Sequence, residues 1–140
     1  LCVGDATGYG AAILSQLVTT VVTLESRAGQ LDEARRAWAN LDMCNIAVAR
    51  GSGCKGCGPH APYEVVMVCG AIEFVPDDLL RQMSPGGRLA AVIRRADSVG
   101  TGVITLFEKD KDGECHGGQA LADASTLFLE DFRTEPVFVF

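Results

Sequence analysis

LCVGDATGYG, residues 1–10, joins a short apolar strand to a glycine-rich turn. Residues 11–18 follow with apolar side chains at the spacing of a helix. A strand, a glycine turn and a helix in direct succession predict the first unit of an open α/β sheet, in which ligands bind beyond the carboxyl ends of the strands. Residues 4–8 are therefore the first candidate for a binding site.

The rest of the chain continues this alternation. Residues 28–41 and 76–83 show the apolar spacing of helices. The last two strands are expected to pair antiparallel at one edge, because no crossover helix is predicted between them. We therefore expect one domain over residues 1–140: a Rossmann-like α/β fold with a mostly parallel seven-stranded sheet, an antiparallel C-terminal edge and helices on both faces. The predicted strands are residues 1–3, 21–25, 45–49, 64–69, 89–93, 103–107 and 137–140.

Two of these elements carry expectations about burial. Residues 65–68 are a continuous apolar run, the pattern of a strand that is buried on both faces. The helix at residues 28–41 has one apolar face, which we expect to pack on the core. The residues of that face are Leu31, Ala34, Trp38 and Leu41. Residues 50–62 are predicted to form a loop, and residues 84–87 and 109–113 to form turns.

Composition restricts the class of protein. The net charge of −6 disfavours a nucleic-acid partner, which usually requires a basic face. No apolar run approaches the roughly 20 residues that span a bilayer, so no membrane partner is expected and a cytoplasmic location is the prediction. Because the chain starts at Leu1, inside an apolar strand, we expect it to be a segment truncated at its N-terminus. Its six cysteines are expected to be reduced thiols.

The turn and Glu25 together indicate a nucleoside ligand. Glu25 ends the second strand, 21 residues after Gly4, where an acid can accept hydrogen bonds from both ribose hydroxyls. A dinucleotide is less consistent with this turn. The Gly-x-Gly-x-x-Gly pattern of such sites meets Ala6 and Tyr9 at its second and third glycine positions.

Five stretches of the sequence follow one pattern in order and spacing. They are GDATGY at residues 4–9, Glu25, APYE at residues 61–64, the group Ala71, Val75, Pro76, Leu79 and Leu80, and PGGRL at residues 85–89. In these stretches the chain resembles the protein-L-isoaspartate O-methyltransferases, a family of class I S-adenosylmethionine-dependent methyltransferases. The resemblance extends over residues 1–89 and, more loosely, to the end of the chain.

This resemblance implies S-adenosyl-L-methionine as cofactor and methyl transfer to the isoaspartyl carboxylate of a damaged protein or peptide, which is protein repair. Residues 4–8 would hold the methionine end of the cofactor and Glu25 its ribose. The loop at residues 51–53, together with Cys69 and Gly70, would flank the adenine and the sulfonium. Tyr9 would pack near the cofactor. The cofactor-binding residues so implied are Gly4, Asp5, Ala6, Thr7, Gly8, Tyr9, Glu25, Ser26, Gly51, Ser52, Gly53, Cys69 and Gly70.

The chain also departs from the family pattern. Ala6 stands at the second glycine, Ser52 at a carboxylate that would accept from the adenine amino group, and Cys2 at a further acid. The family's substrate-contacting Ser/Thr segment lies upstream of the first strand, so the sequence assigns no catalytic residue. A degenerate relative that is not catalytic and a nicotinamide-dependent enzyme stay open as alternatives.

Cys54, Cys57 and His60 have part of the spacing of a zinc site. Structural zinc usually takes four ligands from two such pairs, so no metal is expected. A redox Cys-x-x-Cys should open a helix, whereas this one lies among glycines. His116 is interpreted as a loop residue.

Overall fold

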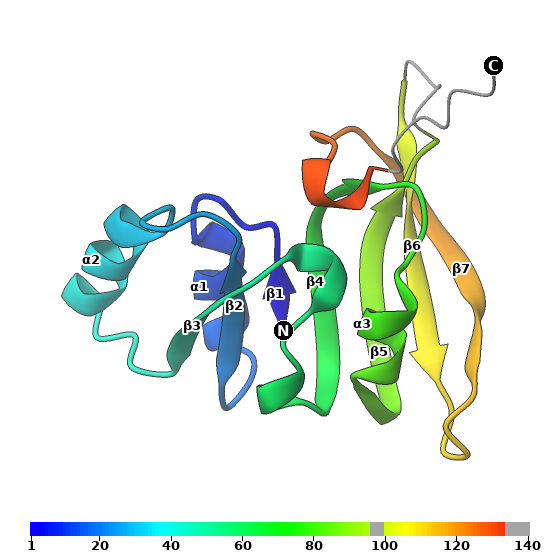
Figure 1. The fold of residues 1–140 in the computed structure, drawn as a ribbon, viewed down its shortest axis with the longest axis horizontal. Coiled ribbons are helices and arrows are strands. Elements are labelled where there is room, and N and C mark those ends of the chain that lie inside the picture. The colour runs from blue at the N-terminus through cyan, green and yellow to red at the C-terminus, as the bar shows by residue number, and fades with distance from the viewer. Residues whose placement is uncertain (96–99, 134–140) are drawn as a thin grey trace, which may run out of the picture.

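The computed structural model describes residues 1–95 and 100–133, which form one seven-stranded sheet (Figure 1). Its strand order is β3-β2-β1-β4-β5-β6-β7. The first five strands pair in parallel, and β6 and β7 continue the sheet antiparallel. The predicted fold class is therefore confirmed. The strands are β1 (Cys2–Val3), β2 (Val21–Glu25), β3 (Ile46–Arg50), β4 (Tyr63–Ile72), β5 (Met83–Ile93), β6 (Gly102–Lys109) and β7 (Cys115–Ala124).

Helices cover both faces of the sheet, as predicted. Because successive strand residues point to opposite faces, Cys2 and Val3 of β1 belong to two separate hydrophobic clusters. Helices α1 (Tyr9–Ser15) and α2 (Asp32–Asn40) pack on the Cys2 face. Helix α3 (Asp77–Arg81) packs on the Val3 face, together with the 3-10 turns η1 (Gly53–Lys55) and η3 (Glu130–Phe132). A third 3-10 turn, η2 (Gly58–His60), buries no residue.

The helices are shorter than the sequence predicts. The expected helix at residues 28–41 begins at Asp32, because Gly29 has a φ of 78° and turns the chain before it. Trp38 is buried in the core as predicted, but Leu41 follows the helix and is 64% exposed. The expected helix at residues 76–83 ends at Arg81.

The predicted turn at residues 84–87 lies inside β5. Met83 already pairs with Tyr63 of β4, and the pairing resumes at Arg88 opposite Val65. The turn is therefore an irregularity within a long strand. Gly86, with a φ of 78°, accommodates it.

Burial of β4 on both faces was a wrong expectation. Val66 and Val68 are buried on the α3 face, while Val65 and Met67 are only half-buried on the other. The cause is the position of α1, which contacts β2 and β3 and leaves the β4 side of that face partly open. The loop expected at residues 50–62 contains the turns η1 and η2.

The seventh strand differs from its prediction. The strand expected at residues 137–140 lies outside the described residues, and the sheet is completed by β7 instead. Its sequence, CHGGQALADA, lacks β-branched residues and contains two glycines, so it has no strand signature of its own. His116, expected in a loop, lies in β7 and contacts Asp110 Oδ2 at 2.8 Å through Nε2.

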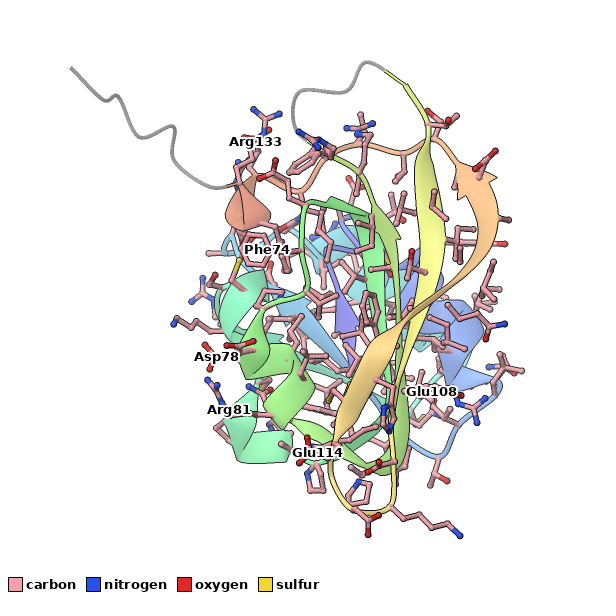
Figure 2. All side chains as sticks on the ribbon, turned by 90° about the vertical axis from the view of Figure 1, so that its right-hand side faces the viewer. Phe74, Asp78, Arg81, Glu108, Glu114 and Arg133 are labelled. Atoms are coloured by element: carbon pink, nitrogen blue, oxygen red, sulfur yellow. The ribbon has the colours of Figure 1, made fainter. Side chains whose placement is uncertain are left out.

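Figure 2 looks at this edge of the sheet and shows Asp78 and Arg81 of α3 to one side of β6 and β7. Within residues 1–95 and 100–133, no helix is long and apolar enough to cross a membrane.

Candidate functional site

A cavity of about 510 Å³ opens at the carboxyl ends of the central strands. Strand β1 lies between β2 and β4 there, so the strand order reverses at this point. Such reversal points are where open α/β sheets bind ligands, and the volume lies within the range of small-molecule sites. The described lining residues are Val3, Gly4, Asp5, Ala6, Thr7, Leu24, Ser26, Arg27, Gln30, Gly53, Cys69, Thr126, Leu127, Phe128, Leu129, Glu130, Asp131 and Phe132.

The loop after β1 forms one wall, which we call the N-terminal wall (residues 4–7). Gly4 begins it with a φ of 76°, a conformation that glycine adopts without strain. Asp5 is 8% exposed, and its Oδ2 accepts a hydrogen bond of 2.8 Å from the backbone N–H of Ala11 in α1. Its Oδ1 accepts one of 3.1 Å from Thr7 Oγ1. Asp5 therefore ties the loop to the first turn of α1.

Gly8 has a packing role rather than a place in the cavity lining. Its φ is 72°, and a Cβ there would lie 2.4 Å from Ala34 Cβ and 2.5 Å from Trp38 Cζ2. Trp38 Nε1 also donates a hydrogen bond of 3.2 Å to Gly8 O. Absence of a side chain at Gly8 thus lets α1 approach α2. Tyr9 is 70% exposed and does not line the cavity, and its expected packing near the cofactor stays a prediction.

Glu25 and Ser26 lie at the end of β2, but only Ser26 lines the cavity. The side chain of Glu25 is 1% exposed. Its Oε1 accepts from the backbone N–H of Leu31 at 3.2 Å, and its Oε2 is 3.3 Å from Arg35 Nη2. The carboxylate therefore fixes the start of α2, and its predicted contact with a ribose stays a prediction.

The loop after β3 reaches the cavity through Gly53 alone. Gly51 donates its N–H to Glu25 O, whereas Ser52 is exposed and does not appear in the lining. Gly53 lies under Phe132, because a Cβ there would be 2.7 Å from Phe132 Cε2. The predicted adenine contact of Ser52 stays untested.

Residues 126–132 form the opposite wall, which we call the C-terminal wall. Ala71, near the end of β4, donates to Leu127 O at 2.8 Å and accepts from Leu129 N at 2.9 Å. Asp131 Oδ2 accepts from Gly53 N at 3.3 Å. These bonds attach residues 126–132, which follow β7, to the end of β4 and to the loop after β3.

Leu129 places its side chain on the floor of the cavity. A Cβ at Gly4 would lie 2.6 Å from Leu129 Cδ1, and one at Gly70 would lie 2.5 Å from Leu129 Cγ. Gly70 therefore supports Leu129 and does not line the cavity itself. The two glycines allow the C-terminal wall to contact the ends of β1 and β4.

Two thiols meet beneath the cavity. Cys2 Sγ lies 3.6 Å from Cys69 Sγ, and Cys69 lines the cavity. The hydrogen bond with Cys69, followed by burial, raises the pKa of Cys2 far above its ordinary value. Cys2 is thus a neutral thiol and does not supply the charge of the acid it replaces.

The Cys54 and Cys57 pair is part of the packing. Cys54 Sγ donates to Asp131 O, and burial, followed by the nearby Asp131, raises the pKa of this thiol. Tyr63 OH donates a hydrogen bond of 2.7 Å to Cys57 O. Among the residues that the structure describes, no group of three or more His, Cys, Asp and Glu side chains is arranged to hold a metal.

The structure thus brings seven of the predicted residues to the cavity and leaves six outside its lining. Those in the lining are Gly4, Asp5, Ala6, Thr7, Ser26, Gly53 and Cys69. Those outside are Gly8, Tyr9, Glu25, Gly51, Ser52 and Gly70. The sequence interpretation missed the C-terminal wall entirely, as well as Val3, Leu24, Arg27 and Gln30. The continuous apolar run Leu127, Phe128 and Leu129 was the available sign of an extended segment.

Over residues 1–126, the chain matches the sequence model of the family described as Protein-L-isoaspartate(D-aspartate) O-methyltransferase. The chain belongs to this family. The protein-L-isoaspartate O-methyltransferase of Methylibium petroleiphilum is 35% identical over 111 residues, which are 79% of this chain and 41% of that protein. That of Halorhodospira halophila is 32% identical over 131 residues, 94% of this chain and 57% of that protein. The chain spans about half the length of these relatives.

Solved structures agree with this membership. A protein-L-isoaspartate O-methyltransferase superposes with a TM-score of 0.79 and 27% identity, covering 91% of this chain and 40% of the other. A Plasmodium falciparum protein in complex with S-adenosyl-L-homocysteine has a TM-score of 0.71 over 93% of this chain and 64% of its own. At 16% identity, the second match shows the fold alone. The resemblance noted in the five sequence stretches is confirmed.

Proposed function

We propose that the cavity binds S-adenosyl-L-methionine and that the protein transfers its methyl group to the isoaspartyl carboxylate of damaged proteins. The observation that carries this proposal is the cavity at the reversal of strand order, lined by the glycine turn that characterises the family. The S-adenosyl-L-homocysteine complex of the Plasmodium falciparum protein supports the choice of ligand. Protein repair in the cytoplasm is the corresponding cellular role.

The residues present fit this cofactor. The N-terminal wall offers backbone groups and Thr7 to the methionine end, because its glycine lets the backbone approach closely. Ser26 and Gln30 offer polar groups beside the end of β2, where the ribose is expected. Leu24, Gly53 and Phe132 would give apolar contact to the adenine, and Cys69 would lie on the sulfonium side.

Glu25 keeps its proposed role as the ribose acceptor. Its carboxylate is adjacent to Ser26, and exchange of its bond to Leu31 N or Arg35 would expose one oxygen toward the cavity. Alternatively, Glu25 has a purely structural role and only fixes the start of α2 through its bonds to Leu31 N and Arg35. Glu25→Gln, measured for both stability and cofactor affinity, decides between them. A purely structural role predicts a loss of stability with unchanged affinity of the folded protein, whereas a ribose contact also lowers the affinity.

Methyl transfer to a carboxylate requires little acid–base assistance. S-Adenosyl-L-methionine supplies a methyl group already activated by the sulfonium, so alignment with the carboxylate accounts for most of the rate. The chain's own residues therefore act by binding and orientation. The two walls would hold the ligand between them, and Leu129, which packs against Gly4 and Gly70, would exclude water from that side.

Calorimetric titration with S-adenosyl-L-homocysteine tests the cofactor assignment. We expect saturable binding in the micromolar range, weakened about fivefold in Ser26→Ala by loss of a hydrogen bond. Ser52→Ala is the matched control, because Ser52 does not line the cavity. Unchanged affinity in this variant would support the lining described above. A loss equal to that of Ser26→Ala would support the contact between Ser52 and adenine that the sequence predicts. Saturable NADH binding without S-adenosyl-L-homocysteine binding would overturn the proposal.

Transfer of a labelled methyl group to an isoaspartyl peptide tests the reaction. We expect incorporation into that peptide and none into its normal aspartyl counterpart. Cofactor binding without transfer by a protein that includes the segments upstream in its relatives would favour the non-catalytic alternative. We also retain residues 1–140 as one domain, which the single continuous sheet supports.

A further inference from the structure

Phe128, in the C-terminal wall, is contacted by two arginines. The guanidinium carbon of Arg94 is 5.4 Å from the centroid of its ring, and that of Arg133 is 5.3 Å away. Arg94 follows β5, Arg133 follows the turn η3, and Phe128 pairs with Ala71 near the end of β4. Three segments that are distant in sequence therefore meet at one aromatic ring. Phe128 also lines the cavity, whereas Arg94 and Arg133 do not, so the two arginines lie next to the cavity and outside its lining.

We propose that Arg94 and Arg133 form a binding site for a carboxylate of the peptide substrate. This inference rests on the proposed function, because it assigns residues to the acceptor rather than to the cofactor. Figure 2 shows Arg133 at the end of the molecule toward which β5 points, which is also where the cavity opens. A peptide that reaches the cofactor from this side would pass the two arginines.

The aromatic ring orients the guanidinium groups for this task. A planar guanidinium that lies over a ring keeps its N–H groups at its edge, where they can pair with both oxygens of a carboxylate. Arg94 is further fixed by its backbone N–H, which donates to Ile72 O at 2.9 Å, and by Nη1, which donates to Thr126 O at 3.1 Å. A guanidinium has five N–H donors, so one such bond leaves donors for a ligand.

Because the chain is acidic overall, a local cationic site favours binding of an anionic peptide. The net charge of −6 disfavours such a peptide over most of the surface. Arg133 pairs with Glu130 at 3.1 Å, but their side chains are 55% and 67% exposed. Pairs this exposed are weak, so a substrate carboxylate can replace Glu130. Asp131, next along the wall, directs its carboxylate to Gly53 N instead.

Binding of a labelled peptide in the presence of saturating S-adenosyl-L-homocysteine tests the site without depending on turnover. The probe is a short fluorescent peptide with one L-isoaspartyl residue and uncharged neighbours, and fluorescence anisotropy gives its affinity. We expect Arg94→Gln and Arg133→Gln each to weaken binding about tenfold, because a charge-assisted hydrogen bond is lost. Arg94→Lys should weaken it less, since the charge is retained without the planar fork.

Two further variants make the test specific. Arg36→Gln removes the same charge from an exposed site on α2, which contributes no described residue to the cavity, and should leave peptide affinity unchanged. Glu130→Gln removes the competitor of Arg133 and should tighten binding about twofold. Equal peptide affinity of wild type, Arg94→Gln and Arg133→Gln would overturn the proposal, as would failure of the wild type to bind.

Two peptide forms identify which carboxylate is bound. Amidation of the isoaspartyl α-carboxyl should remove most of the affinity if that group is the ligand. If a glutamate placed beside the amidated residue restores binding that depends on Arg94, the ligand is a flanking acid. Arginine-independent binding of every form refutes the site. The affinity for S-adenosyl-L-homocysteine, measured in each variant, is a separate readout. If the wild type does not bind S-adenosyl-L-homocysteine, the proposed function is refuted. If the arginine variants bind both S-adenosyl-L-homocysteine and the peptide as tightly as the wild type does, only the arginine site is refuted.

Discussion

The two walls of the cavity differ in how the chain builds them. The N-terminal wall is four consecutive residues between β1 and α1, held by Asp5 to a helix that begins two residues later. The C-terminal wall comes from beyond β7 and is held by Ala71, Gly53 and the packing of Phe132. One wall depends on local backbone geometry and the other on contacts across most of the sequence. The first can therefore be inferred from a short motif, and the second only from the assembled sheet.

Replacement of Phe132 should produce the largest effect and break the C-terminal wall. Phe132 is 2% exposed and packs over Gly53 and Val3. Phe132→Ala leaves a cavity and is expected to lower the free energy of unfolding by about 3 kcal/mol, measured by urea denaturation. Phe132→Leu should cost about 1 kcal/mol. A loss below 1 kcal/mol for the alanine variant would show that the wall is attached only through its backbone.

Gly8→Ala tests the N-terminal side with an effect of about 2 kcal/mol. The new Cβ meets Ala34 and Trp38 at distances that require a shift of α1 or α2, and the residue must also adopt a positive φ. Gly86→Ala is the matched control, with a φ of 78° and nothing within 4 Å of its Cβ. It should cost about 1 kcal/mol, from backbone strain alone. Equal losses in the two variants would remove the packing role assigned to Gly8.

Asp5→Ala should cost about 1 kcal/mol, since the backbone N–H of Ala11 loses its acceptor. We expect a matching loss of affinity for S-adenosyl-L-homocysteine, because the loop is no longer fixed to α1. Thr7→Val removes the bond that Thr7 Oγ1 donates to Asp5 and the one it accepts from Tyr9 N. It leaves the bond between Asp5 and Ala11 in place and should cost about 0.5 kcal/mol. If the ligand affinity of Asp5→Ala is unchanged, attachment of the loop to α1 is not required for binding.

Acid should have the smallest effect, at the turn between β6 and β7. Hydrogen bonds from His116 and, next, from Glu114 N hold the pKa of Asp110 below its usual value. A carboxylate with a depressed folded pKa stabilises the protein above its unfolded pKa, and this contribution is lost as the pH falls below about 4. Thermal melts of wild type and Asp110→Asn should therefore converge below that pH. Parallel melting temperatures from pH 7 to 3 would contradict the assignment.

The sequence predicts the parts of the fold that depend on short-range pattern. Residues 1–25 already indicate strand, turn, helix and strand, and the apolar runs place β4 and β5. It misses β7, because CHGGQALADA becomes a strand only by pairing with β6. Glu25 shows the same limit at the site. Its position at the end of β2 is predictable, but the direction of its carboxylate depends on Leu31 and Arg35, whose approach the sequence does not reveal.

The antiparallel pairing of β5, β6 and β7 decides at which end of the sheet the chain leaves β7. Each hairpin reverses the direction of the chain, and two in succession restore it, so β7 runs the same way as β1 and ends on the cavity side. An odd number of reversals would release residues 126–132 at the opposite end of β6, about 27 Å away for its eight residues. Lengthening the turn between β6 and β7 preserves this parity, whereas deletion of either strand does not. Insertions at that turn should therefore be tolerated in engineered forms. Removal of β7, although its sequence shows no strand pattern, would displace the C-terminal wall from the cavity.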